Sequence, residues 1–455
     1  MKKIMVLTFL LFMLSACSKN PTESPMSTVI AYPNIDIAPP TSVMPLLPTP
    51  THTPSPIHMP IEFEDNLNDL SLIGSGERAI AIFRENSDLP IKKLSSWPNY
   101  MEGVEYEFRW CDAGDIILSE WEEDLALRIT FNEATKWPTE LPELFDPKKI
   151  IDIGKNPGLG VRSLHDSGIV GNGVNIGIID MAMNVEALEF ADNIVWYEEM
   201  HNQFKTTHFH GPAVTSLAVG KNTGVAPGAK VYYIAASRDD FIPDYAIDNT
   251  YTANAIRRLL DISELLPEGE KLSAISISQG FWDGQLGYED VMEAIAEAKA
   301  VGIAVITCSL ETTHGVYITE LVRGRMDDPD EVENYGVLPR MESSMTQSSS
   351  PYSLYVDKVT GLGSLGIPMA SRSYIMSTDS NGWENTSIGG SSWIVPWITG
   401  MYSLCVQVNP NISFEHFLEL ASETASLVER TAWSGEAYVL RIINPTALID
   451  AVSGK

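Results

Sequence analysis

Gly173-Val174-Asn175-Ile176-Gly177-Ile178-Ile179-Asp180, residues 173–180, is an almost uninterrupted apolar run that ends in a carboxylate. A short apolar run of this kind is typical of a strand that is buried on both faces of a sheet. A carboxylate at the end of a buried strand needs a partner, because an unpaired charge is costly to bury. Taken alone, such an aspartate more often only caps the following turn.

Further apolar runs follow and alternate with amphipathic stretches. Strands are predicted at residues 230–234, 273–278 and 303–307. A helix is predicted at residues 288–301, where apolar residues recur at helical spacing at Val291, Ala294, Ile295 and Ala298. Buried strands that alternate with helices predict an α/β fold in three layers, with a mostly parallel central sheet flanked by helices. Functional sites of such sheets form beyond the carboxyl ends of the strands.

Two other segments carry residues suited to nucleophilic chemistry. The stretch His208-Phe209-His210-Gly211 opens a run of small residues that is suited to a tightly packed helix. His210 is favoured over His208, because it directly precedes a glycine that permits close backbone approach. In Gly389-Gly390-Ser391-Ser392-Trp393, glycines lead into a helix whose first backbone N–H groups point outward and can stabilise an oxyanion. Each segment alone has a plainer interpretation, as a capping histidine and as a flexible loop.

Asp180, His210 and Ser392 occur in the chain order of the subtilisin triad. The segments around them resemble blocks of the subtilisin family of serine peptidases. Similar blocks are the strand that ends in Asp180, His210-Gly211, Gly224-Val225-Ala226-Pro227-Gly228-Ala229, residues 390–400 and Asn409-Pro410-Asn411. The resemblance spans about residues 150–450. It implies a subtilisin-like fold and a serine endopeptidase with an Asp180-His210-Ser392 triad.

The resemblance also implies roles for individual residues. His210 is expected to act as the general base, Asp180 to orient it, and Ser392 to form an acyl-enzyme. The stretch Ser276-Ile277-Ser278-Gln279-Gly280 is similar to the strand edge that pairs with substrate, so Ser276, Ser278 and Gly280 are expected to bind protein or peptide substrates. No cofactor is required for this chemistry. The resemblance leaves calcium binding open, since many relatives bind calcium at surface loops. The sequence itself contains no acidic cluster with diagnostic spacing.

The sequence departs from the family pattern at the oxyanion hole. The family supplies an asparagine amide after the strand predicted at 303–307, but residues 307–315 contain no asparagine. Removal of one such donor costs about 2.7 to 4 kcal/mol of transition-state stabilisation. Ser309, Thr312 and Thr313 are the candidate substitutes, together with the backbone N–H of Ser392. The missing amide favours an alternative, a catalytically impaired protein that binds peptides at the cell surface.

The amino terminus predicts export and a lipid anchor. Lys2 and Lys3 precede an apolar run, and Leu14-Ser15-Ala16-Cys17 resembles a bacterial lipobox in which Cys17 is acylated. Residues 1–17 are therefore a predicted lipoprotein signal peptide, with an ordinary secretory signal as the alternative. The chain is expected on the outer face of the cell membrane, or on the periplasmic membrane face in a cell with two membranes. A tethered binding or adhesion lipoprotein would explain the anchor but not the triad segments.

Composition divides the rest of the chain. Residues 18–60 are rich in Pro, Ser and Thr and are expected to be a disordered tether. Residues 61–150 are expected to be a small α+β module, either a retained accessory module or a propeptide-like segment, and residues 151–455 are expected to be the peptidase domain.

With 30 basic and 60 acidic residues, the net charge of -30 argues against nucleic acid as a partner. Besides Cys17 there are three cysteines, an odd number that argues against a disulfide framework.

Overall fold

The structure is a computed structural model that describes part of the 455-residue chain. The described residues are 79–80, 92–93, 106–115, 129–143, 145–201, 208–236, 247–337, 364–375, 382–387, 389–431, 435 and 437–454. The predicted signal peptide, Cys17 and the predicted tether lie outside these residues.

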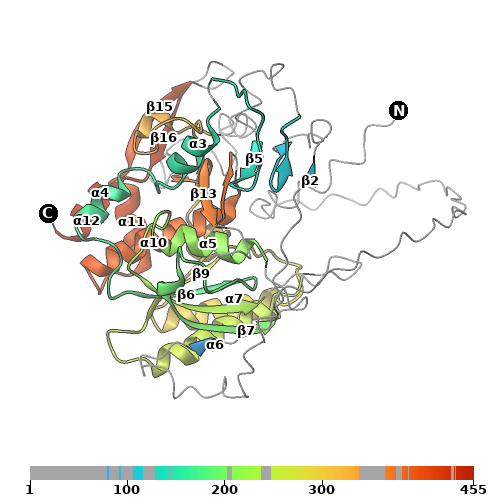
Figure 1. The fold of residues 1–455 in the computed structure, drawn as a ribbon. Helices are drawn as coiled ribbons and strands as arrows, with labels where there is room; N and C mark the ends of the chain where they lie inside the picture. Colours follow the sequence, from blue (N-terminus) through green and yellow to red (C-terminus); the bar gives the residue numbers. More distant parts are fainter. Residues whose placement is uncertain are drawn as a thin grey trace, which may run out of the picture.

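A parallel sheet of six strands forms the centre of the molecule (Figure 1). Its strands, in spatial order, are β1 (Ala79–Ile80), β7 (Ile194–His201), β8 (Lys230–Ala236), β6 (Asn175–Asp180), β9 (Leu272–Ile277) and β10 (Ala304–Thr307). Every neighbouring pair in the sheet is parallel. The four strands predicted from apolar runs are all present, and the predicted α/β class is confirmed.

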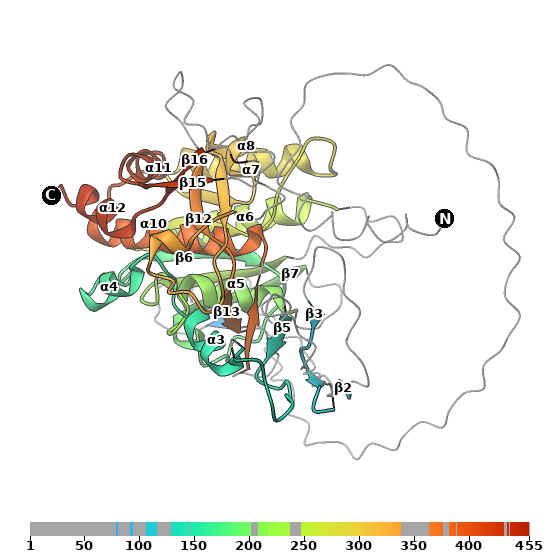
Figure 2. The same ribbon diagram turned by 90° about the horizontal axis from the view of Figure 1, so that it is seen from above.

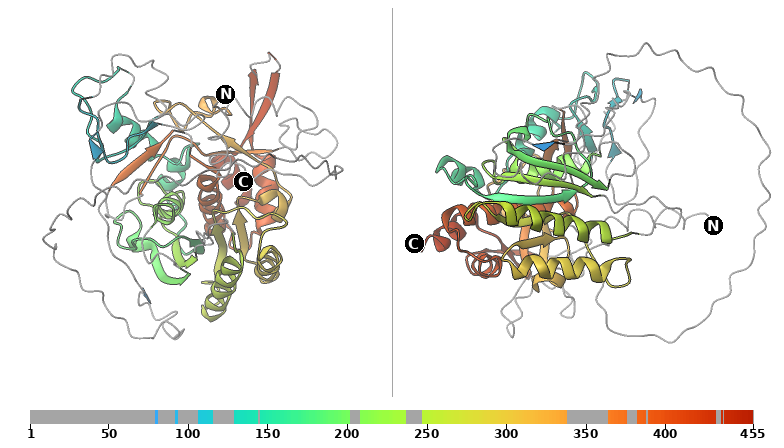
Figure 3. Two further views of the ribbon diagram at one scale, coloured as in Figure 1. Left: turned by 90° about the vertical axis from the view of Figure 1, so that its right-hand side faces the viewer. Right: turned by 90° about the horizontal axis from the view of Figure 1, so that it is seen from below.

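Helices cover both faces of this sheet. On one face, α6 (Thr250–Leu265) and α7 (Tyr288–Ala300) run side by side (Figure 3). The residues of α7 that were predicted to face the core are buried, namely Val291, Ala294, Ile295 and Ala298. On the other face lie α5 (His210–Val219) and α10 (Ile394–Val408), which contact each other and the strands (Figure 1).

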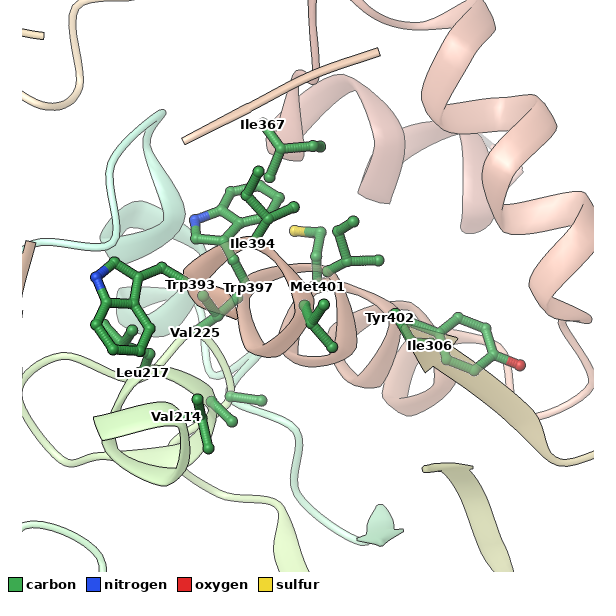
Figure 4. Packing of buried hydrophobic residues seen from close by; sticks show 14 of the residues in the cluster. Val214, Leu217, Val225, Ile306, Ile367, Trp393, Ile394, Trp397, Met401 and Tyr402 are labelled. Carbon is green, nitrogen blue, oxygen red and sulfur yellow. The ribbon is translucent and has the colours of Figure 1, made fainter. Parts of the chain in front are cut away.

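Helix α10 is the main buried helix of the second face. It begins at Ile394, directly after the serine turn, and Pro396 is tolerated there because it lies in the first turn of the helix. Trp397 is fully buried, and its indole N–H donates to the carbonyl of Pro157 at 3.0 Å. Around this helix lie Val214, Leu217, Val225 and Ile367 (Figure 4). The segment that carries the serine is therefore held by a continuous apolar core.

A second sheet joins segments that are far apart in the sequence. Its spatial order is β13 (Arg372–Ile375), β14 (Trp383–Thr386), β5 (Ile129–Asn132) and β3 (Tyr106–Glu107). Strand β14 pairs with β13 and with β5 in antiparallel fashion, so residues 129–132 share a sheet with the segment before Ser392 (Figure 2). Phe108, Phe131, Phe145 and Ile150 form a separate small core beside it.

The remaining elements complete the periphery. A third sheet contains β11 (Ile318–Leu321), β12 (Leu365–Pro368), β16 (Ala437–Ile442) and β15 (Ser426–Thr431), and β2 (Lys92–Lys93) pairs with β4 (Cys111–Asp112). The other helices are α3 (Pro147–Gly154), α4 (Val161–Asp166), α8 (Leu310–His314), α11 (Phe414–Glu423) and α12 (Pro445–Val452). Within the described ranges, no helix has the length and apolar character needed to cross a bilayer. Cys111, Cys308 and Cys405, all among the described residues, form no disulfide.

The apolar core around α10 predicts a large stability loss on truncation of Trp397. Trp397→Ala is expected to lower the free energy of unfolding by about 3 to 5 kcal/mol, because a fully buried indole and its hydrogen bond are lost. Urea unfolding followed by circular dichroism measures this loss. Leu427→Ala is the control, because Leu427 is 65% exposed, and its unfolding midpoint should stay close to that of the wild type. Equal midpoints for the two variants would contradict the assigned core.

Candidate active site

The carboxyl ends of three parallel strands bring the candidate residues to one edge of the central sheet. Asp180 is the last residue of β6, Ser278 follows β9, and Thr307 is the last residue of β10. Because neighbouring parallel strands end on the same side, these residues lie close together although they are far apart in the sequence. The candidate residues therefore lie beyond the carboxyl ends of the strands, where the functional sites of such sheets form.

The Asp180 carboxylate and the His210 imidazole form a direct pair. His210 Nδ1 lies 2.7 Å from Asp180 Oδ1 and 2.9 Å from Oδ2. The Asp180 side chain is 1% exposed, and its Oδ1 also accepts from the backbone N–H of Met181 at 2.8 Å. A carboxylate can only accept hydrogen bonds, so Nδ1 carries the hydrogen and Nε2 is the basic nitrogen of the neutral ring. This tautomer is the one that a general base requires.

Close packing behind α5 explains why His210, not His208, faces the carboxylate. A Cβ atom on Gly211 would lie 2.4 Å from the carbonyl oxygen of Met181 and 2.5 Å from the hydroxyl of Tyr233. Only glycine permits this approach, as expected from the sequence. His208 has a supporting position, where its Nδ1 accepts from the backbone N–H of His210 at 3.2 Å.

Ser392 lies in a single 3-10 turn, η5 (Ser391–Trp393), that leads directly into α10. Its Oγ donates to the carbonyl of Ser278 at 3.3 Å, and the Ser278 hydroxyl donates to the carbonyl of Ser392 at 2.9 Å. These two reciprocal hydrogen bonds join the serine turn to the end of β9. The next residue, Trp393, has its ring centroid 5.6 Å from that of His210, which places the turn beside the histidine.

The residues expected to bind substrate are all buried, but they differ in the pairing of their main chain. Ser276 lies inside the sheet, because its strand β9 is paired on one side with β6 and on the other with β10. Its main chain is therefore unavailable to a peptide, which is a correction to the expected edge. Ser278 and Gly280 lie beyond the end of the paired strand, so any peptide pairing by this stretch is restricted to them.

The three candidate oxyanion donors also differ. Ser309 is 2% exposed, and its hydroxyl accepts from Phe281 N–H at 2.9 Å and contacts the Phe281 carbonyl at 3.3 Å. The Thr313 hydroxyl donates to the carbonyl of Ser309 at 3.1 Å. Thr312 is exposed on α8, and its hydroxyl makes no hydrogen bond within the described chain. Ser309 and Thr313 therefore hold the local backbone, whereas the Thr312 hydroxyl is available to a ligand.

Two residues that contact the serine turn, Glu320 and Tyr374, were not found by sequence reasoning. The Ser391 hydroxyl donates to a carboxylate oxygen of Glu320 on β11. Trp393 is 6% exposed, and its ring lies between that of His210 and that of Tyr374, whose centroid is 4.8 Å away. The only sequence signal for this packing of rings was the bulk of Trp393 itself, since His210 and Tyr374 lie on other segments.

The described residues contain no cluster of three or more His, Cys, Asp or Glu side chains placed to hold a metal ion. The described contacts of Asp180 and His210 are with backbone and side-chain atoms.

Comparisons with known proteins give only distant structural likenesses. No family model matches the sequence, and no curated protein matches it. Among solved structures, the prenylagaramide maturation protease PagA is similar at 12% identity and a TM-score of 0.45, over 65% of this chain and 99% of that chain. The PatG macrocyclase domain is similar at 12% identity and a TM-score of 0.41, over 65% and 95% of the two chains. The PatG macrocyclase in complex with peptide gives 13% identity, a TM-score of 0.42 and coverage of 65% and 96%. Likenesses at this level carry no information on activity.

The serine turn depends on the glycine that precedes it. Gly389 has φ of +72°, and a Cβ atom there would lie 2.5 Å from the Trp393 ring. Gly389→Ala is expected to destabilise the protein by at least about 1 to 2 kcal/mol, the cost of a left-handed conformation for an L-residue. Gly390→Ala is the matched control, because Gly390 has an extended backbone and nothing lies within 4 Å of its added Cβ. Urea midpoints of the two variants provide the comparison, and a less stable Gly390→Ala would contradict the described turn.

Proposed function

We propose that this chain is a serine endopeptidase that hydrolyses peptide bonds through Asp180, His210 and Ser392. The observation that carries the proposal is the hydrogen bond between the buried Asp180 carboxylate and His210 Nδ1. The buried aspartate orients the imidazole, and Trp393, which directly follows Ser392 at the start of α10, packs beside that imidazole. The parts of a nucleophilic site are therefore present.

The proposed reaction starts with a change in the hydrogen bond of Ser392. Its hydroxyl has a single proton, which points to the Ser278 carbonyl in the described geometry. A rotation of this side chain redirects the proton to His210 Nε2 as Oγ attacks the substrate carbonyl. Asp180 stabilises the resulting imidazolium, which then protonates the leaving amine. Water hydrolyses the acyl-enzyme with His210 again as the base.

The oxyanion would be stabilised chiefly by backbone at the start of α10. The N–H of Ser392 lies in the turn that opens this helix, where backbone donors are not used within the helix. Of the side-chain candidates, Thr312 is favoured over Ser309 and Thr313, whose hydroxyls are bound to backbone carbonyls. Thr312 is therefore proposed as the substitute for the missing amide, with a lower rate than an asparagine would give.

The proposed substrates are proteins or peptides, with their main chain placed along Ser278 and Gly280. Recognition through main-chain hydrogen bonds tolerates many sequences. The alternative is a catalytically impaired protein that binds peptides at the cell surface. It is favoured by one observation, the absence of an asparagine in residues 307–315.

A fluorophosphonate probe separates the two functions. We expect the purified full chain to be labelled covalently, and Ser392→Ala to lose the label, because the probe reacts only with an activated serine hydroxyl. Ser391→Ala is the matched control, since it removes the neighbouring hydroxyl and should still be labelled. Label incorporation is measured by intact-protein mass spectrometry. A folded wild-type chain that takes up no label favours the peptide-binding alternative.

We also propose that the enzyme is exported and held at the membrane by lipid on Cys17. Diacyl modification anchors durably, because each buried CH2 contributes about 0.8 kcal/mol and more than one chain is attached. Cys17→Ser is expected to move the protein from the membrane fraction to the soluble fraction, measured by fractionation and immunoblotting. Cys111→Ser is the control and should remain with the membrane. Wild-type protein in the soluble fraction would support an ordinary secretory signal instead.

A further inference from the structure

A second buried carboxylate lies behind the candidate active site. Glu384 is 1% exposed and lies on β14, eight residues before Ser392. Its Oε1 accepts from Arg109 Nη1 at 2.6 Å and from the Tyr374 hydroxyl at 2.9 Å. Its Oε2 has no hydrogen-bond partner within the described chain. Arg109 is the cation that directly compensates this carboxylate.

Arg109 comes from the segment before residue 150, which was predicted to be a separate module. It follows β3, and β3 and β5 extend the sheet to which β14 belongs. Glu384 itself is the register partner of Asn132 on β5. Arg325 adds another link, because its guanidinium donates to the carbonyl of Ile129 on β5 and, at 3.2 Å, to that of Asn385 on β14. Loss of this segment would leave β14 at a sheet edge and Glu384 without its cation.

The carboxylate is connected to the catalytic histidine by packed rings. Tyr374, which donates to Glu384, has its ring centroid 4.8 Å from that of Trp393. Trp393 is buried, and its ring is 5.6 Å from that of His210. The order of contacts is therefore Arg109, Glu384, Tyr374, Trp393 and His210. Each neighbouring pair is joined by a hydrogen bond or by ring packing.

We infer that Arg109 is a positioning residue of the active site, which acts on His210 through Glu384, Tyr374 and Trp393. Residues 106–115 and 129–132 then form a permanent part of the catalytic unit and do not belong to a detachable propeptide. The inference rests on the proposed function for its kinetic consequences only. Its structural part, the coupling of Arg109 to the His210 ring, is independent of turnover.

The charges around Glu384 determine how the effect of removing Arg109 on reactivity should change with pH. Burial raises the pKa of Glu384 to about 7, whereas Arg109 and the Tyr374 hydroxyl lower it and the nearby Glu107 raises it. Without Arg109 the pKa rises further. As pH rises through that value, the buried carboxyl of the variant loses its proton and becomes a charge without a cation. A defect caused by this charge therefore grows with pH, whereas a simple packing defect is independent of pH.

The test compares full-length Arg109→Gln, Glu384→Gln and the double variant with wild type. We expect Arg109→Gln to react with the fluorophosphonate about tenfold more slowly or worse on the alkaline side of that raised pKa, with a deficit that shrinks as pH falls through it. The double variant, which has no buried carboxylate, should recover to within about threefold of Glu384→Gln. Arg257→Gln is the matched control, because Arg257 pairs with Glu297 between α6 and α7 on the opposite face of the sheet, and it should label as wild type does.

A second readout keeps the inference separate from the proposed function. In protein with isotope-labelled histidine, the His210 imidazole resonance should shift in Arg109→Gln and remain in place in Arg257→Gln. If wild type takes up no label but this resonance shifts, the proposed function fails and the coupling stands. If wild type is labelled while Arg109→Gln keeps both the wild-type rate and the wild-type resonance, the coupling is overturned. A deficit that is constant with pH and is not recovered in the double variant also overturns it.

Discussion

The burial of the Asp180 carboxylate is the constraint on which the arrangement of the site depends. A carboxylate with 1% exposure must be compensated by a cation or by hydrogen-bond donors. His210 Nδ1 and the N–H of Met181 supply that compensation, and they require α5 to start close to the end of β6. That approach leaves no room for a side chain at residue 211. One buried charge thus determines the position of a helix, the identity of a glycine and the tautomer of the imidazole.

Asp180 and Glu384, two of the buried carboxylates among the described residues, have partners of different kinds. Asp180 faces a histidine, whose ring can accept and release a proton, whereas Glu384 faces Arg109, which is always charged. A partner that changes its charge is suited to proton transfer, and a partner with constant charge is suited to holding strands together. The His210 ring packs against Trp393, and Tyr374, which donates to Glu384, packs against the same Trp393. We therefore assign chemistry to the first pair and positioning to the second.

Sequence reasoning succeeded where local pattern decides the structure. The strands of the central sheet were predicted because they are apolar runs, and α7 because its buried residues recur at helical spacing. It failed where the structure depends on distant partners. The pairing of β5 with β14 joins segments about 250 residues apart, and no local pattern encodes it. The correction at Ser276 has the same cause, since only the strand order reveals that β9 is an inner strand. Ser309 was a candidate donor to the oxyanion, but its hydroxyl forms hydrogen bonds with the backbone of Phe281, which the local sequence does not reveal.

The use of Ser309 as a structural link has a consequence for the proposed reaction. Its hydroxyl ties the loop after β9 to the segment after β10, so the segment in which the resemblance to subtilisins predicts an amide donor adds rigidity to the loop after β9. A weaker oxyanion hole must be offset by binding energy from parts of the substrate that are remote from the reacting bond. Such an enzyme should favour longer peptides that engage Ser278 and Gly280 over short ones. Rigidity of the loop after β9 would favour binding of such a peptide, because a loop that is already ordered loses less entropy when the peptide binds.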